Sequence, residues 1–317
     1  EFGPCALREA TTPEASRPLA AETVADGFVS GARICEASSH SLDGGVGAVV
    51  AAIKGATLRD GPWRDHIFEI SDEGYADRVA DALLTSGFAV VRGALTSDQT
   101  AALAQTAAEA AEEMLRFDPP RLGNRGPRRY SFGGASQTHH MVHLEAWAQL
   151  LDIEALRPIL QKSFNGSYVA VGGGGDFVLG ETDTHQRLHV DLQLFDMYSV
   201  SSTPAAIAAN FAVSSVDCED GPMRLVPGTQ MLPLVYAEEA SKGEELARLS
   251  SLEKEPVLRQ RLGLSSLVVC PMQPGDVLLR DMRLWHGGTP NFGSNTRFLP
   301  SAEFLSPWYA ALTAGTD

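Results

Sequence analysis

Two histidines and one aspartate are the residues of this chain best suited to act together chemically. His189 and Asp191 lie two positions apart in a strand-like run, so their side chains point to the same face. His286 follows ninety-five positions after Asp191. Two imidazoles and one carboxylate on one side of an octahedral Fe(II) leave positions open for O2 and a cosubstrate. We therefore expect an oxygenase-type iron site.

An arginine lies at a suggestive distance from this trio. Arg297 comes eleven positions after His286 and begins the last clear strand pattern. Its guanidinium can bind a carboxylate through two parallel hydrogen bonds, which suits the distal carboxylate of a dicarboxylic cosubstrate. A His-x-Asp pair alone occurs often by chance. The later His286 and Arg297 make the pattern much more specific.

The elements that must position these side chains change in type along the chain. Apolar residues recur at helical spacing first, and short runs rich in β-branched residues, separated by Gly, Pro, Asn or Asp, follow. Helices are predicted near 71–86, 98–116 and 143–151, with a helical insert at 236–252. Strands are predicted at 88–91, 168–171, 177–179, 188–195, 206–213, 223–226, 267–269, 277–279 and 297–304. This order predicts an α+β fold with a sandwich or barrel core.

The N-terminal part differs in composition from the rest. Residues 1–60 are rich in Ala, Ser, Thr, Gly and Glu and have weak periodicity, so we expect an extension that is partly flexible or wraps the main domain. Residues 61–317 are expected to form a single domain. The chain begins with Glu1 instead of methionine, so organelle targeting cannot be judged from it.

Charge and cysteine content narrow the function classes. The chain has 25 Lys and Arg against 40 Asp and Glu, a net charge of −15, which argues against broad nucleic-acid binding and against attachment to anionic membranes. The longest nearly apolar run, 46–53, is too short to span a bilayer. Four scattered cysteines without a Cys-x-x-Cys pair favour reduced thiols in a soluble intracellular protein.

Four further motifs give the chain a family resemblance. They are Gly87-Phe88-Ala89-Val90-Val91-Arg92-Gly93, Asp220-Gly221-Pro222-Met223-Arg224-Leu225-Val226-Pro227-Gly228-Thr229, Pro274-Gly275-Asp276-Val277-Leu278-Leu279 and His286-Gly287-Gly288-Thr289-Pro290-Asn291. Together with His189-Val190-Asp191 and Arg297, their order resembles the phytanoyl-CoA dioxygenase (PhyH) family of Fe(II)/2-oxoglutarate oxygenases. Residues 1–60 lie outside the resemblance.

The resemblance implies a double-stranded β-helix core (jelly roll, cupin-like) flanked by N-terminal helices. His189, Asp191 and His286 match the Fe(II) ligands of that family, and Arg297 matches the residue that clamps 2-oxoglutarate. The implied reaction uses O2 to oxidise a C–H bond of a small or lipid-like substrate, for which an anionic group is left open, while 2-oxoglutarate becomes succinate and CO2. Related halogenases replace the carboxylate ligand, so an intact Asp191 favours hydroxylation, desaturation or ring formation.

Two more residues are implied as cosubstrate contacts. Asn210 stands in the strand where many relatives carry a tryptophan near the cosubstrate, and its amide can donate a hydrogen bond to 2-oxoglutarate. Thr289 stands where a small hydroxyl residue often supports the cosubstrate carboxylate. Both are carried over from the family pattern, and Asn210 departs from it.

Four residues are candidates for contact with the substrate. Arg187 and Gln193 flank the metal motif at intervals of two and should share its inward face, where Arg187 can bind an anionic group or pair with an acid such as Asp183. Arg129 belongs to a basic and aromatic stretch, 121–132, that either collects an acidic substrate or is a solvated loop. His140 lies in a cluster of histidines for which substrate contact, zinc binding and ordinary solvation all remain open.

A run of glycines precedes Asp176. Residues 172–175 are four consecutive glycines without the Lys-Ser/Thr of a phosphate loop, so we expect a mobile loop at the rim of the pocket.

One alternative function is a catalytically silent β-helix protein that binds a ligand. The other is the same oxidation on a macromolecule, either a modified base or a protein residue. The intact triad argues against the silent alternative.

Overall fold

The computed structural model describes residues 65–133, 140–186, 188–192, 203–231, 267–269 and 271–314. The expected extension at 1–60 and the expected helical insert at 236–252 lie outside these residues.

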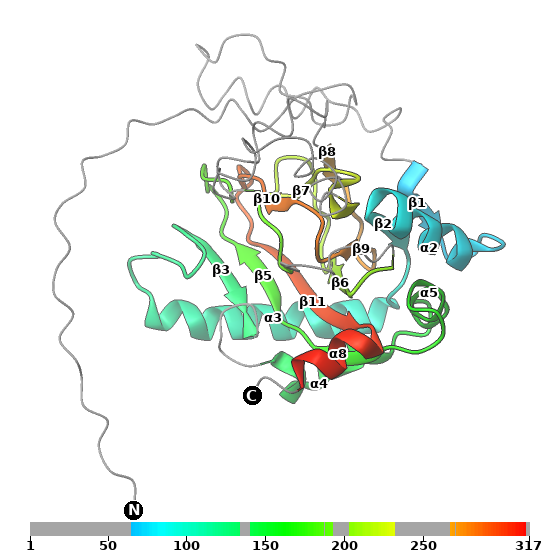
Figure 1. The fold of residues 1–317 in the computed structure, drawn as a ribbon. Coiled ribbons are helices and arrows are strands. Elements are labelled where there is room, and N and C mark those ends of the chain that lie inside the picture. The colour runs from blue at the N-terminus through cyan, green and yellow to red at the C-terminus, as the bar shows by residue number, and fades with distance from the viewer. Residues whose placement is uncertain are drawn as a thin grey trace, which may run out of the picture.

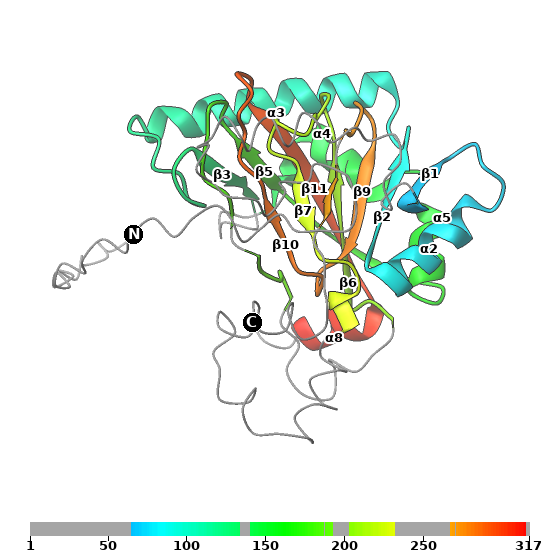
Figure 2. The ribbon, with the colours of Figure 1, turned by 90° about the horizontal axis from the view of Figure 1, so that it is seen from above.

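The described chain is a layered α+β structure, which confirms the expected fold class (Figures 1 and 2). An eight-stranded sheet has the order β1-β2-β9-β6-β11-β5-β3, with β4 paired to β11, and a three-stranded sheet has the order β10-β7-β8. Figure 2 shows α3 and α4 on one side of the large sheet and β7 and β10 on the other.

The strands are β1 (Ile67–Glu69), β2 (Phe88–Arg92), β3 (Arg129–Phe132), β4 (Val169–Gly172), β5 (Gly175–Val178), β6 (Ala206–Phe211), β7 (Met223–Leu225), β8 (Leu267–Val269), β9 (Val277–Asp281), β10 (His286–Gly288) and β11 (Arg297–Leu305). The α-helices are α2 (Tyr75–Ser86), α3 (Ser97–Phe117), α4 (Glu145–Ala148), α5 (Arg157–Ser163) and α8 (Pro307–Thr313). Short 3-10 helices are η5 (Met141–His143), η6 (Gln149–Asp152) and η8 (Thr229–Met231).

The two long helices begin and end where local chemistry dictates. The Thr96 side chain accepts a hydrogen bond from the Gln99 backbone while the Gln99 side chain accepts one from Thr96, so a capping box starts α3. Helix α2 ends at Gly87, whose φ of 83° is readily adopted by glycine and whose N–H bonds to Ala82 and Leu83 carbonyls.

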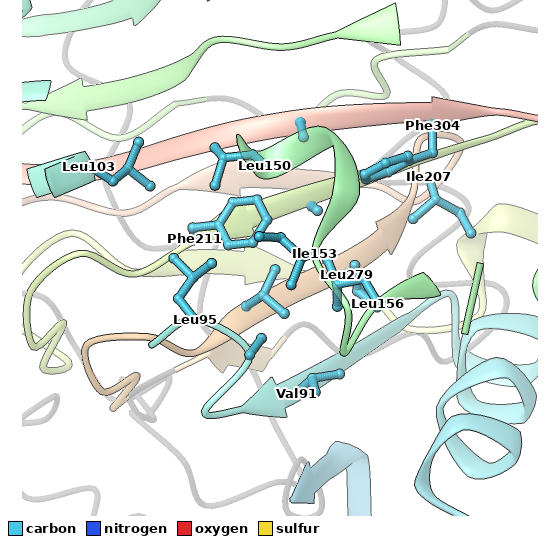
Figure 3. Packing of buried hydrophobic residues seen from close by; sticks show 14 of the residues in the cluster. Val91, Leu95, Leu103, Leu150, Ile153, Leu156, Ile207, Phe211, Leu279 and Phe304 are labelled. Atoms are coloured by element: carbon cyan, nitrogen blue, oxygen red, sulfur yellow. The ribbon is translucent and has the colours of Figure 1, made fainter. Parts of the chain in front are cut away.

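Alternation along the strands divides the core into two layers. On β2, Ala89 and Val91 point into a cluster shared with the helices, which we call the helix-side cluster (Figure 3). Phe88 and Val90 point the other way, into an inter-sheet cluster that includes Leu225 of the small sheet. Because both faces of the large sheet are covered, its central strands are apolar at nearly every position, and polar residues there are conspicuous.

Three local expectations need correction. Within 188–192 the strand predicted at 188–195 is only an isolated bridge between His189 and His286. The basic and aromatic stretch 121–132, for which a solvated loop was one alternative, contains part of strand β3 because Phe132 and Tyr130 join the core, and β3 pairs with β5. Cys218 is disulfide-bonded, so the expected reduced thiol is wrong at this position.

The glycine run is held by close backbone packing. Residues 172–175 end β4 and begin β5. A Cβ on Gly173 would overlap the Ser301 carbonyl, and one on Gly174 would overlap the Phe132 carbonyl. The run therefore exists because neighbouring backbones leave no room for side chains, which contrasts with the expected mobile loop.

None of the helices in the described ranges has the length and apolar character that a bilayer crossing requires.

Truncating the helix-side cluster should destabilise the fold. Leu279 of β9 is fully buried there, and Leu279→Ala should lower the free energy of unfolding by about 2–5 kcal/mol. Leu84→Ala, at a position 42% exposed, is the matched control and should change it by less than about 0.5 kcal/mol. Urea denaturation followed by circular dichroism measures both, and equal effects would contradict this assignment of the core.

Candidate functional site

The three residues singled out first converge between the two sheets. Ligand atoms of His189, Asp191 and His286 all lie within 4.8 Å of one another. The Nε2 atoms of His189 and His286 lie 3.5 Å from Oδ1 and Oδ2 of Asp191, respectively. Two backbone hydrogen bonds of 2.9 Å join His189 to His286. Residues almost a hundred positions apart are thus fixed side by side before any metal is considered.

The orientation of His286 presents one ring nitrogen to the site. Its Nδ1 lies 3.0 Å from the Leu284 carbonyl, which can only accept, so Nδ1 carries the proton and Nε2 is left as a ligand atom. Burial, reinforced by the Arg280 charge, lowers the pKa of His286 to about 3. The ring is therefore neutral at physiological pH, as metal ligation requires.

The Asp191 carboxylate is held by a buried arginine. Nη2 of Arg280 donates to Oδ2 of Asp191 at 2.5 Å, and the Arg280 side chain is 6% exposed. Burial alone would raise the pKa of Asp191, but Arg280, His286 and His189 together hold it well below its usual range. The carboxylate is consequently ionised and oriented.

Gln186 supports the neighbouring imidazole. Its side-chain nitrogen lies 3.5 Å from Nε2 of His189, and its side-chain oxygen accepts a hydrogen bond from the Gly288 backbone at 3.2 Å. The segment before the His-x-Asp pair is thereby tied to β10.

Two buried arginines lie away from the triad on the inner face of the large sheet. Arg129 and Arg297 both pair with Val178 of β5 and so flank it on one face. Nη1 of Arg297 donates to Asp176 at 2.6 Å, and its Nε donates to the Gly221 carbonyl at 3.0 Å. Burial and the nearby Arg297 lower the pKa of Arg129 to about 10, so it stays charged at neutral pH. Two cations sharing one carboxylate leave this region with a positive charge.

A cavity of about 630 Å³ connects the triad with the arginines. Its wall includes His189, Asp191, His286 and Arg297, and further residues from β5, β6, β9 and β11. Space of this size can contain a small dicarboxylate and a second molecule together.

The two secondary cosubstrate candidates have different surroundings. Asn210 lines the cavity, and its Oδ1 accepts a hydrogen bond from Nε of Arg280 at 3.3 Å. The Thr289 hydroxyl instead donates to the Pro222 carbonyl at 2.7 Å, and the residue does not line the cavity. Its own carbonyl accepts from Nη2 of Arg129. The Thr289 hydroxyl thus has a backbone partner and its carbonyl holds an arginine, while its contact with the cosubstrate stays a prediction.

The substrate candidates are only partly placed. His140 lines the cavity, with its ring against Gly172. Arg129 is buried beside Arg297, so its side chain is not solvated, as the loop alternative would have required. Arg187 and Gln193 lie outside the described residues.

Three charged cavity residues were missed from the sequence: Arg280, Asp176 and Glu303. The signal for Arg280 was a charge at the end of an otherwise apolar strand, Val277–Asp281. Glu303 lies at an interval of six from Arg297 on β11, so it shares the inward face. Asp176 follows the glycine run, whose interpretation as a rim loop hid it.

The donor set fits an iron ion. Two neutral imidazole nitrogens and one ionised carboxylate oxygen, with no thiolate among the three, suit Fe(II) with open positions better than structural zinc or an iron–sulfur cluster. An α+β sandwich with such a triad beside buried arginines defines a non-haem Fe(II)- and 2-oxoglutarate-dependent oxygenase.

The family model "Phytanoyl-CoA dioxygenase (PhyH)" matches residues 84–299, more than half of the chain. The chain belongs to this family, so the suspected resemblance is confirmed, and it is a dioxygenase that uses Fe(II), 2-oxoglutarate and O2.

Solved structures agree on the fold. The chain resembles the non-haem α-ketoglutarate-dependent epimerase SnoN from nogalamycin biosynthesis, in complex with Fe3+, α-ketoglutarate and nogalamycin RO, at a TM-score of 0.52 and 19% identity, over 74% of this chain and 85% of that one. The carbocyclase SnoK from the same biosynthesis gives a TM-score of 0.51 and 16% identity, over 74% and 85%. No curated protein sequence matches the chain significantly.

The contact between Arg280 and Asp191 should govern metal affinity. Arg280→Gln removes the charge that orients the carboxylate, so Mn(II) affinity measured by calorimetry should fall by about 10- to 100-fold. Arg78→Gln, at a half-exposed arginine far from the cavity, is the control and should leave affinity unchanged. Unaltered affinity in a folded Arg280→Gln variant would show that Asp191 is positioned without it.

Proposed function

We propose that this dioxygenase oxidises a C–H bond of a small or lipid-like molecule, with His189, Asp191 and His286 as the Fe(II) ligands and Arg297 as the anchor for 2-oxoglutarate. The supporting observation is that one cavity contains the triad and a cationic region. Fe(II) bound with 2-oxoglutarate and O2 supplies an oxidant that removes a substrate hydrogen, with release of succinate and CO2.

The residues of the chain have separate tasks in this proposal. Arg280 orients the Asp191 carboxylate, and the Leu284 carbonyl keeps the proton of His286 on Nδ1 so that Nε2 faces the metal position. Arg297 and Arg129 attract the distal carboxylate of 2-oxoglutarate, for which Asp176 is the resident competitor at 2.6 Å from Arg297. Binding of the cosubstrate therefore exchanges one carboxylate partner of Arg297 for another or shares the guanidinium between them.

The charge and the size of the cavity bear on the chemistry of the substrate. Arg125 reaches the cavity wall from the basic stretch, so a positive charge is available there to an acidic ligand, either the cosubstrate or the substrate. No described residue specifically favours the macromolecular alternative, and a cavity of about 630 Å³ favours a small molecule.

Formation of succinate should depend on the triad. Wild-type protein should convert 2-oxoglutarate to succinate only with Fe(II), and His189→Ala should abolish the reaction because one of three ligands is lost. Succinate quantified by mass spectrometry, with candidate substrates present, is the readout. Equal conversion of 2-oxoglutarate by wild type and His189→Ala would contradict the proposed function.

Loss of Arg297 should weaken cosubstrate binding before it affects the metal. Removing one partner of a buried charge pair costs about 2–5 kcal/mol, so Arg297→Ala should raise the KM for 2-oxoglutarate at least about thirtyfold, with Mn(II) affinity retained. Arg297→Lys should recover part of the loss because the charge remains without the two-pronged geometry. Arg116→Ala, an exposed control, should match wild type. An unchanged KM would exclude Arg297 as the anchor.

A further inference from the structure

Glu303 is a carboxylate on the cavity wall at the metal end. Cross-strand pairing aligns Arg280 with Ala208 and Ala208 with Glu303, and paired residues share a face of the sheet. Glu303 and Arg280 thus flank Ala208 on the inner face, and Arg280 holds Asp191. This places Glu303 beside the proposed metal position.

The same strand shows that Glu303 is remote from the cosubstrate anchor. Arg297 and Glu303 lie six residues apart on β11, a separation of roughly 20 Å along an extended strand. A five-carbon dicarboxylate anchored at Arg297 is much shorter than that. Glu303 therefore faces the part of the cavity left for the substrate.

Glu303 also differs from the other cavity acids in its partners. Asp176 and Asp191 each have an arginine within 2.6 Å. The Glu303 carboxylate has no hydrogen bond or ion pair with any residue that the structure describes. Burial and nearby Asp191 raise its pKa, opposed by Arg280 and His140 at longer range. Sequestering a carboxylate without a partner is unfavourable, and a donor from a bound molecule would relieve that cost.

His140 completes the surroundings of Glu303. Gly172 of β4 pairs with Glu303, and the His140 ring lies directly over Gly172. Both His140 and Glu303 line the cavity. A substrate group bound at Glu303 would therefore lie close to this imidazole.

We propose that Glu303 is a specificity residue that accepts a hydrogen bond from the substrate, so that the substrate carries an amine or a hydroxyl group near the oxidised carbon. This inference rests on the proposed function and refines its substrate class. The anion-binding capacity of the cavity is then assigned chiefly to 2-oxoglutarate at Arg297.

Probes that share one ring can test the inference without the natural substrate. Cyclohexylamine, cyclohexanol and cyclohexanecarboxylate would be added separately to protein loaded with Mn(II) and 2-oxoglutarate. Paramagnetic relaxation of the probe protons reports residence near the metal even for weak binding. Relaxation should be strongest for the ammonium probe, weaker for the alcohol, and at least tenfold weaker than the first for the carboxylate.

Variants identify the residue responsible. Glu303→Gln should reduce the ammonium effect about tenfold, to the level of the alcohol, and Glu303→Ala should reduce both. Glu113→Gln on the exposed face of α3 is the matched control and should behave as wild type. Indistinguishable signals from the three probes, including none at all, or an unchanged ranking in Glu303→Gln, would overturn the inference.

Loading separates this failure from failure of the proposed function. Calorimetry first establishes that wild type and Glu303→Gln bind Mn(II) and 2-oxoglutarate. Absence of that binding in wild type would contradict both the proposed function and the Glu303 inference. Normal binding of Mn(II) and 2-oxoglutarate without the expected probe ranking would contradict the Glu303 inference alone.

Discussion

The ion pair between Arg280 and Asp191 is the interaction on which the rest of the site depends. Asp191 lies in a segment with little regular structure, where its backbone N–H donates to the Met282 carbonyl at 3.1 Å. Arg280 belongs to β9, which pairs with β2 and β6 inside the large sheet. The carboxylate therefore takes its position from a strand in the core. Both imidazoles are then arranged around its two oxygens.

Charge is ordered along the cavity although the chain as a whole is acidic. The net charge of −15 describes the whole sequence, whereas the cavity contains the buried arginines Arg280 and Arg297. Arginine and carboxylate alternate from Arg297 through Asp176 to the metal end, where Glu303 lies. The net charge of the chain was thus a poor guide to the cavity, whose wall has as many arginines as carboxylates, because surface residues dominate the sum.

Short-range sequence patterns predicted much of the fold. The capping box at Thr96 and the glycine end of α2 depend only on neighbours, and the apolar periodicity located β2, β6 and β11. Residue types and spacing indicated the triad and Arg297, and the family motifs then matched them. Strand β3 was missed because Arg128 and nearby glycines with positive φ break its pattern, and its core contacts come from β5.

The sequence did not predict the hydrogen-bond and ion-pair partners of the side chains in the site. Nothing local to Arg280 indicates that it meets Asp191 eighty-nine positions away. Likewise, the Thr289 hydroxyl was expected to face the cavity but meets the Pro222 carbonyl, which only the pairing of β10 with β7 brings near. Such contacts depend on the register between distant strands, which local pattern does not fix.

The glycine run has a consequence for how such a pocket can diversify. Gly175 lines the cavity, and the backbones of Ser301 and Phe132 occupy the space where side chains of the preceding Gly173 and Gly174 would stand. Substitution in the run therefore cannot reshape this wall without moving a strand. His140, whose ring lies over Gly172, can instead change size and charge independently of the sheet, so the side chain that covers the run is the adjustable part of the wall.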